Sequence, residues 1–173
     1  RRSSDLFSTG AADPGPDPGD NLISDVRFEG VAAGPEAIGQ LATNAPIYSD
    51  RTLVYGDPGA LLGAEYILTR NDDRRGTDDG FLTFDLSMDA TVYVLFDSRA
   101  TALPAWLNDD GWAPTGQAIT TDDRGTTRVV HSKDFSAGLV ELGGNAAAPM
   151  FGARSMYGVA AISNADPAPS CSV

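Results

Sequence analysis

The chain has 173 residues, 42% of them hydrophobic, which suits a single domain with a buried core. Acidic side chains outnumber basic ones by 24 to 12. The resulting net charge of −12 excludes nucleic acid as a partner and disfavours anionic membranes, because phosphate binding needs clustered cations. The one cysteine, Cys171, excludes an internal disulfide or a zinc cluster within one chain. No apolar run is long enough to predict a membrane span.

Residues 1–20 predict an arm and a Pro/Gly-rich linker. The first ten show little pattern, and the second ten place proline at alternate positions with Gly and Asp between them. Proline lacks the N–H group that helices and strand pairs need, so this stretch should be extended and semi-rigid. We therefore expect a module at residues 21–165 and a short tail at residues 166–173. The chain opens with Arg1 rather than Met, which suggests a processed or excised product from which a leader could have been removed.

The first half of the module predicts short strands separated by turns. Residues 21–28 carry spaced apolar side chains and predict the first strand, whereas residues 30–45 are small, contain Gly and Pro, and should be irregular. Residues 48–55 and 66–69 predict two further strands, which a glycine-containing turn and one helical turn connect. Residues 71–79, the most charged stretch, should form a loop.

The densest pattern lies in residues 80–86 and 90–99, on either side of the break Ser87-Met88-Asp89. In the first stretch apolar residues alternate with Thr and Asp, as in a half-buried strand. The second is largely apolar on both faces, as in a central strand. A connection this short and polar predicts a β-hairpin at the centre of one all-β domain.

The last third of the chain predicts more short strands with turn residues between them. Pro104 can start a single helical turn that buries Leu103 and Leu107. The predicted strands are residues 117–121, 126–132, 139–142 and 157–162. Many short strands at intervals of about ten residues, without a helical period of useful length, indicate an all-β fold. The expected architecture is a β-sandwich or jelly roll of antiparallel strands with an extended N-terminal arm.

Several motifs resemble a known family. They are Ser49-Asp50-Arg51-Thr52, Gly63-Ala64-Glu65-Tyr66-Ile67, Arg70-Asn71-Asp72-Asp73, residues 91–100, Leu103-Pro104-Ala105-Trp106-Leu107, Ser132-Lys133-Asp134-Phe135 and Leu142-Gly143-Gly144-Asn145. In this order they resemble a non-catalytic, carbohydrate-binding-module-like β-sandwich that recurs in secreted and cell-surface bacterial proteins, often beside polysaccharide lyases and glycoside hydrolases. The resemblance covers residues 48–162 and implies an extracellular accessory domain. Residues 21–45 lie outside it.

Catalysis needs a nucleophile or an acid–base pair, and the sequence offers few candidates. His131, the one histidine, falls inside a predicted strand with no nucleophile motif around it, which favours a structural or surface role. Asp78-Asp79 and Asp109-Asp110 have the chemistry of a glycosidase pair, but adjacent carboxylates on loops are also typical of acidic surface turns. We therefore expect that the protein is not an enzyme.

Hard oxygen donors in residues 71–79 make this loop a candidate calcium site, and calcium is the one cofactor that the sequence suggests. The candidate ligands are Asp72, Asp73, Asp78 and Asp79, with Asn71 beside them. Their spacing does not match an EF-hand, and the two arginines that follow Asp73 compete as counter-charges. A salt-bridged surface loop is the alternative.

A sugar site needs a flat aromatic ring with a few planar polar groups around it. The candidate residues are Trp106, Trp112, Asp97, Arg99, Asp109 and Lys133. The tryptophans flank an acidic turn, and Asp97 and Arg99 end the predicted central strand. Each group has a structural alternative, since either tryptophan can cap the core, Asp97 and Arg99 can form a buried pair, and so can Lys133 with its neighbour Asp134.

Two functions therefore stay open. In the first, the chain is a secreted, non-enzymatic module that binds carbohydrate or anchors an assembly on polysaccharide. In the second, it is a structural subunit of an extracellular filament, surface layer or adhesive assembly, and residues 1–20 lie on a neighbour by strand addition. The partner is a polysaccharide in the first case, and another copy or another extracellular protein in the second.

Overall fold

The computed structural model describes residues 21–164. The predicted arm at residues 1–20 and the tail lie outside the described residues. The strands are β2 (Ile23–Phe28), β3 (Val31–Ala32), β4 (Ile38–Gln40), β5 (Glu65–Ile67), β6 (Leu82–Leu86), β7 (Ala90–Asp97), β8 (Ala113–Thr120), β9 (Thr127–Phe135), β10 (Gly138–Leu142) and β11 (Gly158–Ser163). The helices are η1 (Pro35–Ala37), η2 (Gly59–Leu61), η3 (Asn71–Arg75) and α1 (Ala105–Asp109).

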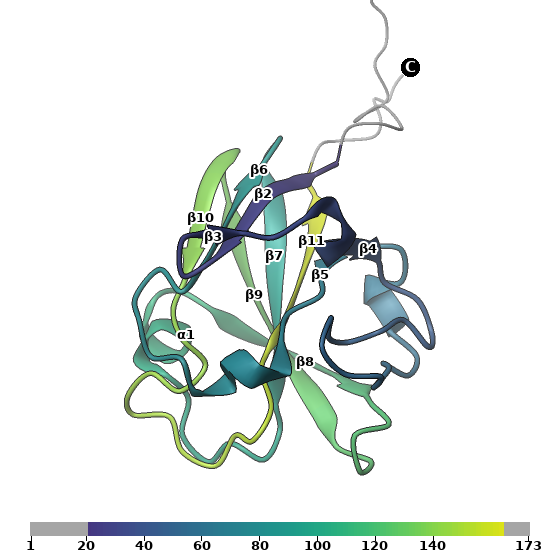
Figure 1. Cartoon of the computed structure of the whole chain (residues 1–173), viewed down its shortest axis with the longest axis vertical. Coiled ribbons are helices and arrows are strands. Elements are labelled where there is room, and N and C mark those ends of the chain that lie inside the picture. The colour runs from purple at the N-terminus through teal and green to yellow at the C-terminus, as the bar shows by residue number, and fades with distance from the viewer. Residues whose placement is uncertain (1–20, 165–173) are drawn as a thin grey trace, which may run out of the picture.

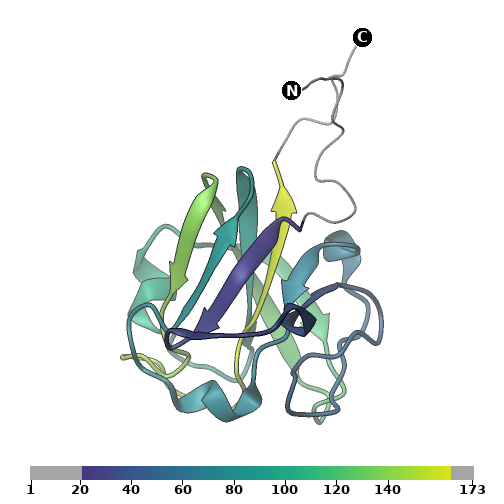
Figure 2. The ribbon, with the colours of Figure 1, turned by 45° about the horizontal axis from the view of Figure 1, so that its top comes forward.

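Two antiparallel sheets pack on each other and confirm the predicted β-sandwich. The smaller sheet has the order β10-β6-β2-β3, and the larger has the order β4-β5-β11-β7-β9-β8 (Figure 1). Figure 2 shows β2, β6 and β10 standing in front of β11, the yellow strand of the larger sheet. One hydrophobic core cluster joins residues from both sheets, such as Phe84 of β6 and Val94 of β7, which are fully buried.

The predicted hairpin between β6 and β7 is wrong. β6 pairs with β2 and β10 in the smaller sheet, whereas β7 pairs with β11 and β9 in the larger sheet. The connection Ser87-Met88-Asp89 therefore runs from the smaller sheet to the larger one. Each of the two strands has one wholly apolar face, and placing them in opposite sheets lets those faces bury each other, whereas a hairpin would lay them side by side. The prediction that β7 is a central strand is confirmed.

A second short connection, from β9 to β10, also changes sheets. A hydrogen bond links this connection to the one between β6 and β7, because Asp89 Oδ1 accepts from the Ala137 N–H at 2.9 Å. Ser87 N–H donates to Leu22 O at the same end of the molecule. The long connections gather at the opposite end, which we call the loop end (residues 68–81, 98–112, 121–126 and 143–157; Figure 1).

Residues 41–63 cover the outer face of the larger sheet. Tyr55 is buried there, and a Cβ added at Gly158 of β11 would lie 2.2 Å from the Tyr55 hydroxyl. The Tyr55 ring meets Tyr66 of β5 edge-on, with 6.1 Å between ring centroids. Only isolated bridges occur in this segment, so the predicted strand at residues 48–55 is wrong. The apolar side chains of this segment pack onto the larger sheet, but its backbone does not join that sheet as a strand.

The other predicted strands hold with shifted ends, whereas the loop predicted at residues 71–79 begins with η3. β2 and α1 occur where the first strand and the helical turn at Pro104 were predicted, and α1 buries Leu107. Residues 31–40 were expected to be irregular but contain β3, η1 and β4. Strands of two or three residues are too short to show a period. Within residues 21–164, no helix is long and apolar enough to cross a membrane.

Candidate functional site

Both predicted tryptophans belong to an aromatic cluster beside α1. Trp112 is only 9% exposed, and its ring centroid lies 6.1 Å from Trp106 and 5.8 Å from Phe135. Trp106 in turn meets Tyr157 edge-on at 5.4 Å, and Tyr157 stacks on Phe96 at 6.4 Å. These rings fill the core next to β9. Trp112, Tyr157 and Phe96 therefore present little open ring face on which a ligand can stack, whereas Trp106 and Phe135 are half-buried.

The motif Gly143-Gly144-Asn145 packs against this cluster and forms hydrogen bonds with it. Trp106 Nε1 donates to Gly144 O at 2.9 Å, and the Tyr157 hydroxyl donates to Gly143 O at 2.9 Å. A Cβ on Gly143 would lie 2.4 Å from the Trp106 ring, and one on Gly144 would lie 2.2 Å from Gly76 O. Asn145 is fully buried and accepts a hydrogen bond from Tyr157 N–H. The glycines are therefore required by close packing.

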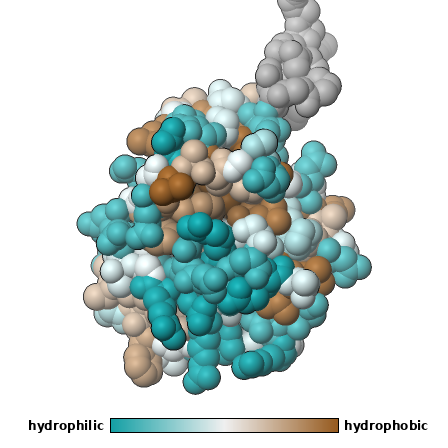
Figure 3. Space-filling model, in the orientation of Figure 1, coloured by the Kyte–Doolittle hydropathy of each residue, from teal (hydrophilic) through white to brown (hydrophobic). Residues whose placement is uncertain are grey.

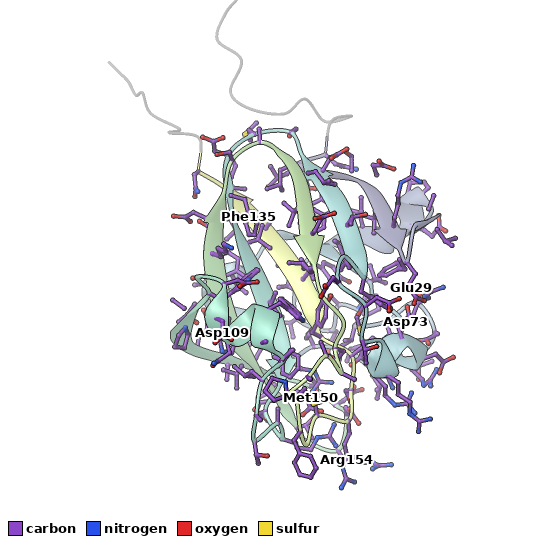
Figure 4. The ribbon with its side chains drawn as sticks, turned by 90° about the vertical axis from the view of Figure 1, so that its left-hand side faces the viewer. Glu29, Asp73, Asp109, Phe135, Met150 and Arg154 are labelled. Atoms are coloured by element: carbon purple, nitrogen blue, oxygen red, sulfur yellow. The ribbon has the colours of Figure 1, made fainter. Side chains whose placement is uncertain are left out.

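Lys133 and Asp109 lie on the outer side of the same region. Lys133 Nζ sits 5.2 Å from the centroid of the Phe135 ring, and its side chain passes next to Gly111. Asp109 is exposed at the end of α1 and accepts a hydrogen bond from Asn108 (Figure 4). The structure thus brings Trp106, Trp112, Asp109 and Lys133 to one side of the molecule. It places Asp97 and Arg99 in a separate cluster.

Asp97 is the centre of that second cluster, at the loop end of β7. Its carboxylate has no exposed surface and accepts hydrogen bonds from the Arg99 guanidinium, with Nη2 to Oδ2 at 2.8 Å. It also accepts from the main-chain N–H groups of Arg99, Arg154 and Ser155, at 3.0, 2.8 and 3.1 Å. Asp97 and Arg99 therefore form the buried pair that was the structural alternative to a ligand site.

Arg128 extends the cluster across the larger sheet. It pairs with Asp97 in the β7–β9 register and is fully buried. Its Nη2 donates to the Tyr48 hydroxyl at 3.1 Å and lies 3.5 Å from Asp123 Oδ2. Ser155 Oγ donates to the same Asp123 oxygen at 3.0 Å and accepts from Arg99 Nη2 at 3.0 Å. The network binds β7, β9 and residues 153–156 to one another.

Burial alone would raise the pKa of Asp97. The hydrogen bonds from the Arg99 guanidinium and from the main-chain N–H groups of Arg99 and Arg154 outweigh that effect, so the pKa of Asp97 lies below its ordinary value. Asp97 is therefore ionised at neutral pH. A charged, fully hydrogen-bonded carboxylate is a strong anchor for the chain segments that donate to it.

The segment that Asp97 anchors carries an exposed aromatic residue that sequence reasoning missed. We call residues 143–155 the Phe151 loop. Phe151 is 72% exposed and is the one exposed aromatic side chain among residues 21–164. Its main chain is fixed on both sides, because Phe151 N–H donates to Ala102 O at 3.0 Å and Thr101 N–H donates to Phe151 O at 2.8 Å. The backbone thus holds an aromatic ring in solvent.

The residues next to Phe151 in the loop include both apolar and charged side chains. Met150 and Ala153 are partly buried and pack against the core. Arg154 is exposed, and its own N–H is one of the Asp97 donors. Gly152 has a φ of +96°, and a Cβ there would lie 2.8 Å from Arg99 O, so the loop passes directly over Arg99. Figure 4 shows Met150 and Arg154 at the loop end, away from Phe135.

The four carboxylates of the predicted calcium site do not come together. Asp72 pairs with Arg51 at 2.7 Å, and Asp73 pairs with Arg70 at 2.8 Å. Among residues 21–164 no group of three or more His, Cys, Asp or Glu side chains is placed to hold a metal ion. The ion pairs match the salt-bridged loop that was the alternative to calcium binding, and the calcium site stays a prediction.

Asp78 has a partner that the sequence did not suggest. A hydrogen bond with Asp78 raises the pKa of Glu29, which follows β2 and has a φ of +50°. Asp73 adds repulsion at the same place, whereas Arg70 opposes it. Figure 4 shows Glu29 and Asp73 close together on one side of the molecule. The group is fully exposed, so solvent weakens all of these interactions.

A pocket of about 180 Å³ lies beside β3. Its lining includes Phe28, Val31, Leu68, Glu36 and Arg70, so it is built largely from residues outside the family resemblance. Figure 3 shows an apolar patch over β3, with hydrophilic residues along its lower border. Phe28 is only 4% exposed, and the Arg70 guanidinium covers its ring at 4.9 Å. The pocket therefore has apolar walls but no open ring face.

His131 lies in β9, on the face that it shares with Val94 of β7. It is 7% exposed, and its Nδ1 makes no hydrogen bond with any described group. Burial lowers the pKa of His131, so the imidazole is neutral at pH 7. This is the environment of a core histidine.

Comparison with solved structures places the fold. The chain is similar to part of a β-glucuronidase from glycoside hydrolase family 2, with a TM-score of 0.66 and 21% identity over 83% of this chain and 15% of that one. A GH138 enzyme that targets pectin rhamnogalacturonan II aligns with a TM-score of 0.47 and 14% identity, over 79% of this chain and 16% of that one. The second likeness is too distant to support an argument.

No family model matches the sequence, and no curated protein matches it. The chain spans about 15% of the length of the β-glucuronidase, so its counterpart there is one part of a much larger protein. At 21% identity the comparison concerns architecture alone. The chain has a β-sandwich fold that also occurs within a glycoside hydrolase.

Proposed function

We propose that this chain is a non-catalytic accessory module that binds carbohydrate through its loop end. The observation that carries the proposal is Phe151, an exposed aromatic ring on a backbone that is hydrogen-bonded on both sides. Sugar rings stack their C–H faces on such rings, and a rigid platform binds at a lower entropic cost than a mobile one. The exposed side chains of Thr101 and Arg154 can donate to hydroxyl groups of a sugar bound there.

The fold supports the same reading. It occurs within a glycoside hydrolase of which it makes up about 15%, so an accessory role beside a separate catalytic part fits its size. The extracellular or cell-surface location and the absence of activity predicted from the sequence belong to this proposal. The structural-subunit alternative depends on residues 1–20, which lie outside the described residues, and it stays a prediction from the sequence.

Affinity electrophoresis against a panel of neutral and acidic polysaccharides tests the proposal. We expect at least one polymer to retard the protein and Phe151→Ala to weaken that binding roughly ten-fold, equal to about 1.4 kcal/mol. Leu139→Ala is the matched control, because Leu139 is also largely exposed, at 63%, but lies on β10. Trp112→Ala is a poor probe, since it would disturb the core. No retardation by any polymer, or equal binding by the Phe151→Ala variant, would overturn the proposal.

A further inference from the structure

We infer that the carbohydrate bound at Phe151 is acidic, a polysaccharide that carries carboxylate groups, and that Arg154 binds the carboxylate of the stacked sugar or of its neighbour. The inference rests on the proposed function and names its ligand class. It comes from Arg154, an exposed arginine in the Phe151 loop that makes no ion pair with a described residue.

Arg154 has a fixed main chain and a free side chain. Its N–H is bound to the buried Asp97 carboxylate at 2.8 Å, so its Cα position is set by the core network. The side chain is exposed and makes no ion pair with any residue in the described part of the chain. It lies three residues after Phe151. A guanidinium three residues from a stacking ring in the same loop is suited to a carboxylate on the stacked sugar or on its neighbour.

The carboxylates of the Asp97 network already have partners. Asp97 is saturated by Arg99 and main-chain donors, and Asp123 accepts from Ser155 and approaches Arg128. Asp122 accepts a hydrogen bond from Val54 N–H at 2.7 Å. Asp109 lies on the other side of Met150 from Arg154 in Figure 4. Arg154 is the one charged residue of the Phe151 loop, and it is left without an ion pair among the described residues.

Arg124 is the second cation without an ion pair in this region. It is exposed in the turn between β8 and β9, next to Asp123, whose carboxylate contacts Ser155. Arg124 and Arg154 thus flank the same network in a chain whose net charge is −12. That net charge repels a polyanion at long range, but at 0.15 M salt such repulsion is screened beyond about 8 Å. Contacts at Phe151 then decide the selectivity.

The test uses the full chain and two forms of one polymer, polygalacturonate and its fully methyl-esterified form, at 0.15 M salt. The polymers share a backbone and differ in carboxylate charge. We expect the acidic form to bind at least ten-fold more tightly. Arg154→Gln should reduce binding of the acidic form roughly ten-fold and leave binding of the ester unchanged. Arg75→Gln is the control, because Arg75 is an exposed arginine on η3 without an ion pair among the described residues.

The outcomes separate this inference from the proposed function. Equal binding of both forms, with no effect of Arg154→Gln, overturns the acidic ligand but leaves carbohydrate binding at Phe151 in place. An equal loss for Arg154→Gln and Arg75→Gln also overturns it, because only overall charge would then matter. Failure of both forms and of every polymer in the wider panel overturns the proposed function itself. A ten-fold loss confined to Arg154→Gln with the acidic polymer supports the inference.

Discussion

The Trp106–Trp112 region and the Phe151 loop use aromatic residues in opposite ways. In the first, rings from α1, β9 and Tyr157 bury one another, and Trp112 keeps only 9% of its surface. In the second, a single ring stands 72% exposed on a backbone that the Asp97 network holds in place. Trp112 belongs to the core, and the proposed binding surface uses an exposed ring in the Phe151 loop.

Replacing Trp112 should have the largest effect on stability. Trp112→Ala leaves a cavity beside Trp106 and Phe135, and we expect it to lower the free energy of unfolding by about 3–5 kcal/mol. Urea unfolding monitored by circular dichroism measures the change. If Trp112→Ala proves as harmless as Leu139→Ala, the ring is not part of the core and the contrast between the two regions fails.

Replacing Asp97 should have the second largest effect on stability, because the Asp97 carboxylate accepts hydrogen bonds from the main chain of the Phe151 loop. Asp97→Asn removes a buried charge and leaves Arg99 and Arg128 without it, which should cost about 3 kcal/mol. We also expect faster hydrogen exchange at the Arg154 and Ser155 amides, which donate to that carboxylate. Asp134→Asn, an exposed carboxylate, should cost less than 1 kcal/mol. Unchanged exchange at both amides would contradict the role of Asp97 as the loop anchor.

The same network predicts how stability depends on acid. Because the pKa of Asp97 is lower in the folded chain than in the unfolded one, its contribution is fully present above the unfolded carboxyl pKa of about 3.9. It is lost as pH falls through the lower folded value. Urea unfolding between pH 6 and pH 3 should therefore show a steeper loss for the parent than for Asp97→Asn. Parallel curves would show that other carboxylates govern acid unfolding.

Replacing Phe151 should have the smallest effect on stability. We expect Phe151→Ala to change the free energy of unfolding by less than about 0.5 kcal/mol, because the ring makes few core contacts. Its backbone hydrogen bonds do not need the side chain, so amide order parameters at residues 150–152 should stay near 0.85 in the parent and in the variant. Order parameters below about 0.6 in the parent would mean that the platform is mobile and not preorganised.

The sequence supported the fold better than the site. Alternation in residues 80–86 correctly identified the buried face of β6, and the two apolar faces of residues 90–99 correctly indicated a central strand. Neither pattern says which buried faces meet. The hairpin was therefore wrong, although the strands were found. Similarly, the end of β7 was recognised as a place where Asp97 and Arg99 could pair. Two further donors to Asp97 come from residues 154 and 155, which no local pattern connects to it.

Phe151 was missed for a related reason. Met150-Phe151 reads as an apolar pair suited to a core, and in the structure only Met150 turns inward. What decides the difference is the pairing of Phe151 with Ala102, a contact between distant parts of the chain. Trp106 and Trp112 were singled out because tryptophan is rare and stacks well. Their burial follows from packing against Tyr157 and Phe135, which composition does not reveal.

The edges of the two sheets have a consequence for solubility. The edge strands β3 and β4 contain only two and three residues, and the register of β8 shifts between Pro114 and Ala118. These three edges therefore pair poorly with a strand from another molecule. β10 is a regular edge strand of five residues, and it carries the exposed Leu139. Where copies crowd together, aggregation by strand pairing should therefore begin at β10, and a charged residue at position 139 should delay it.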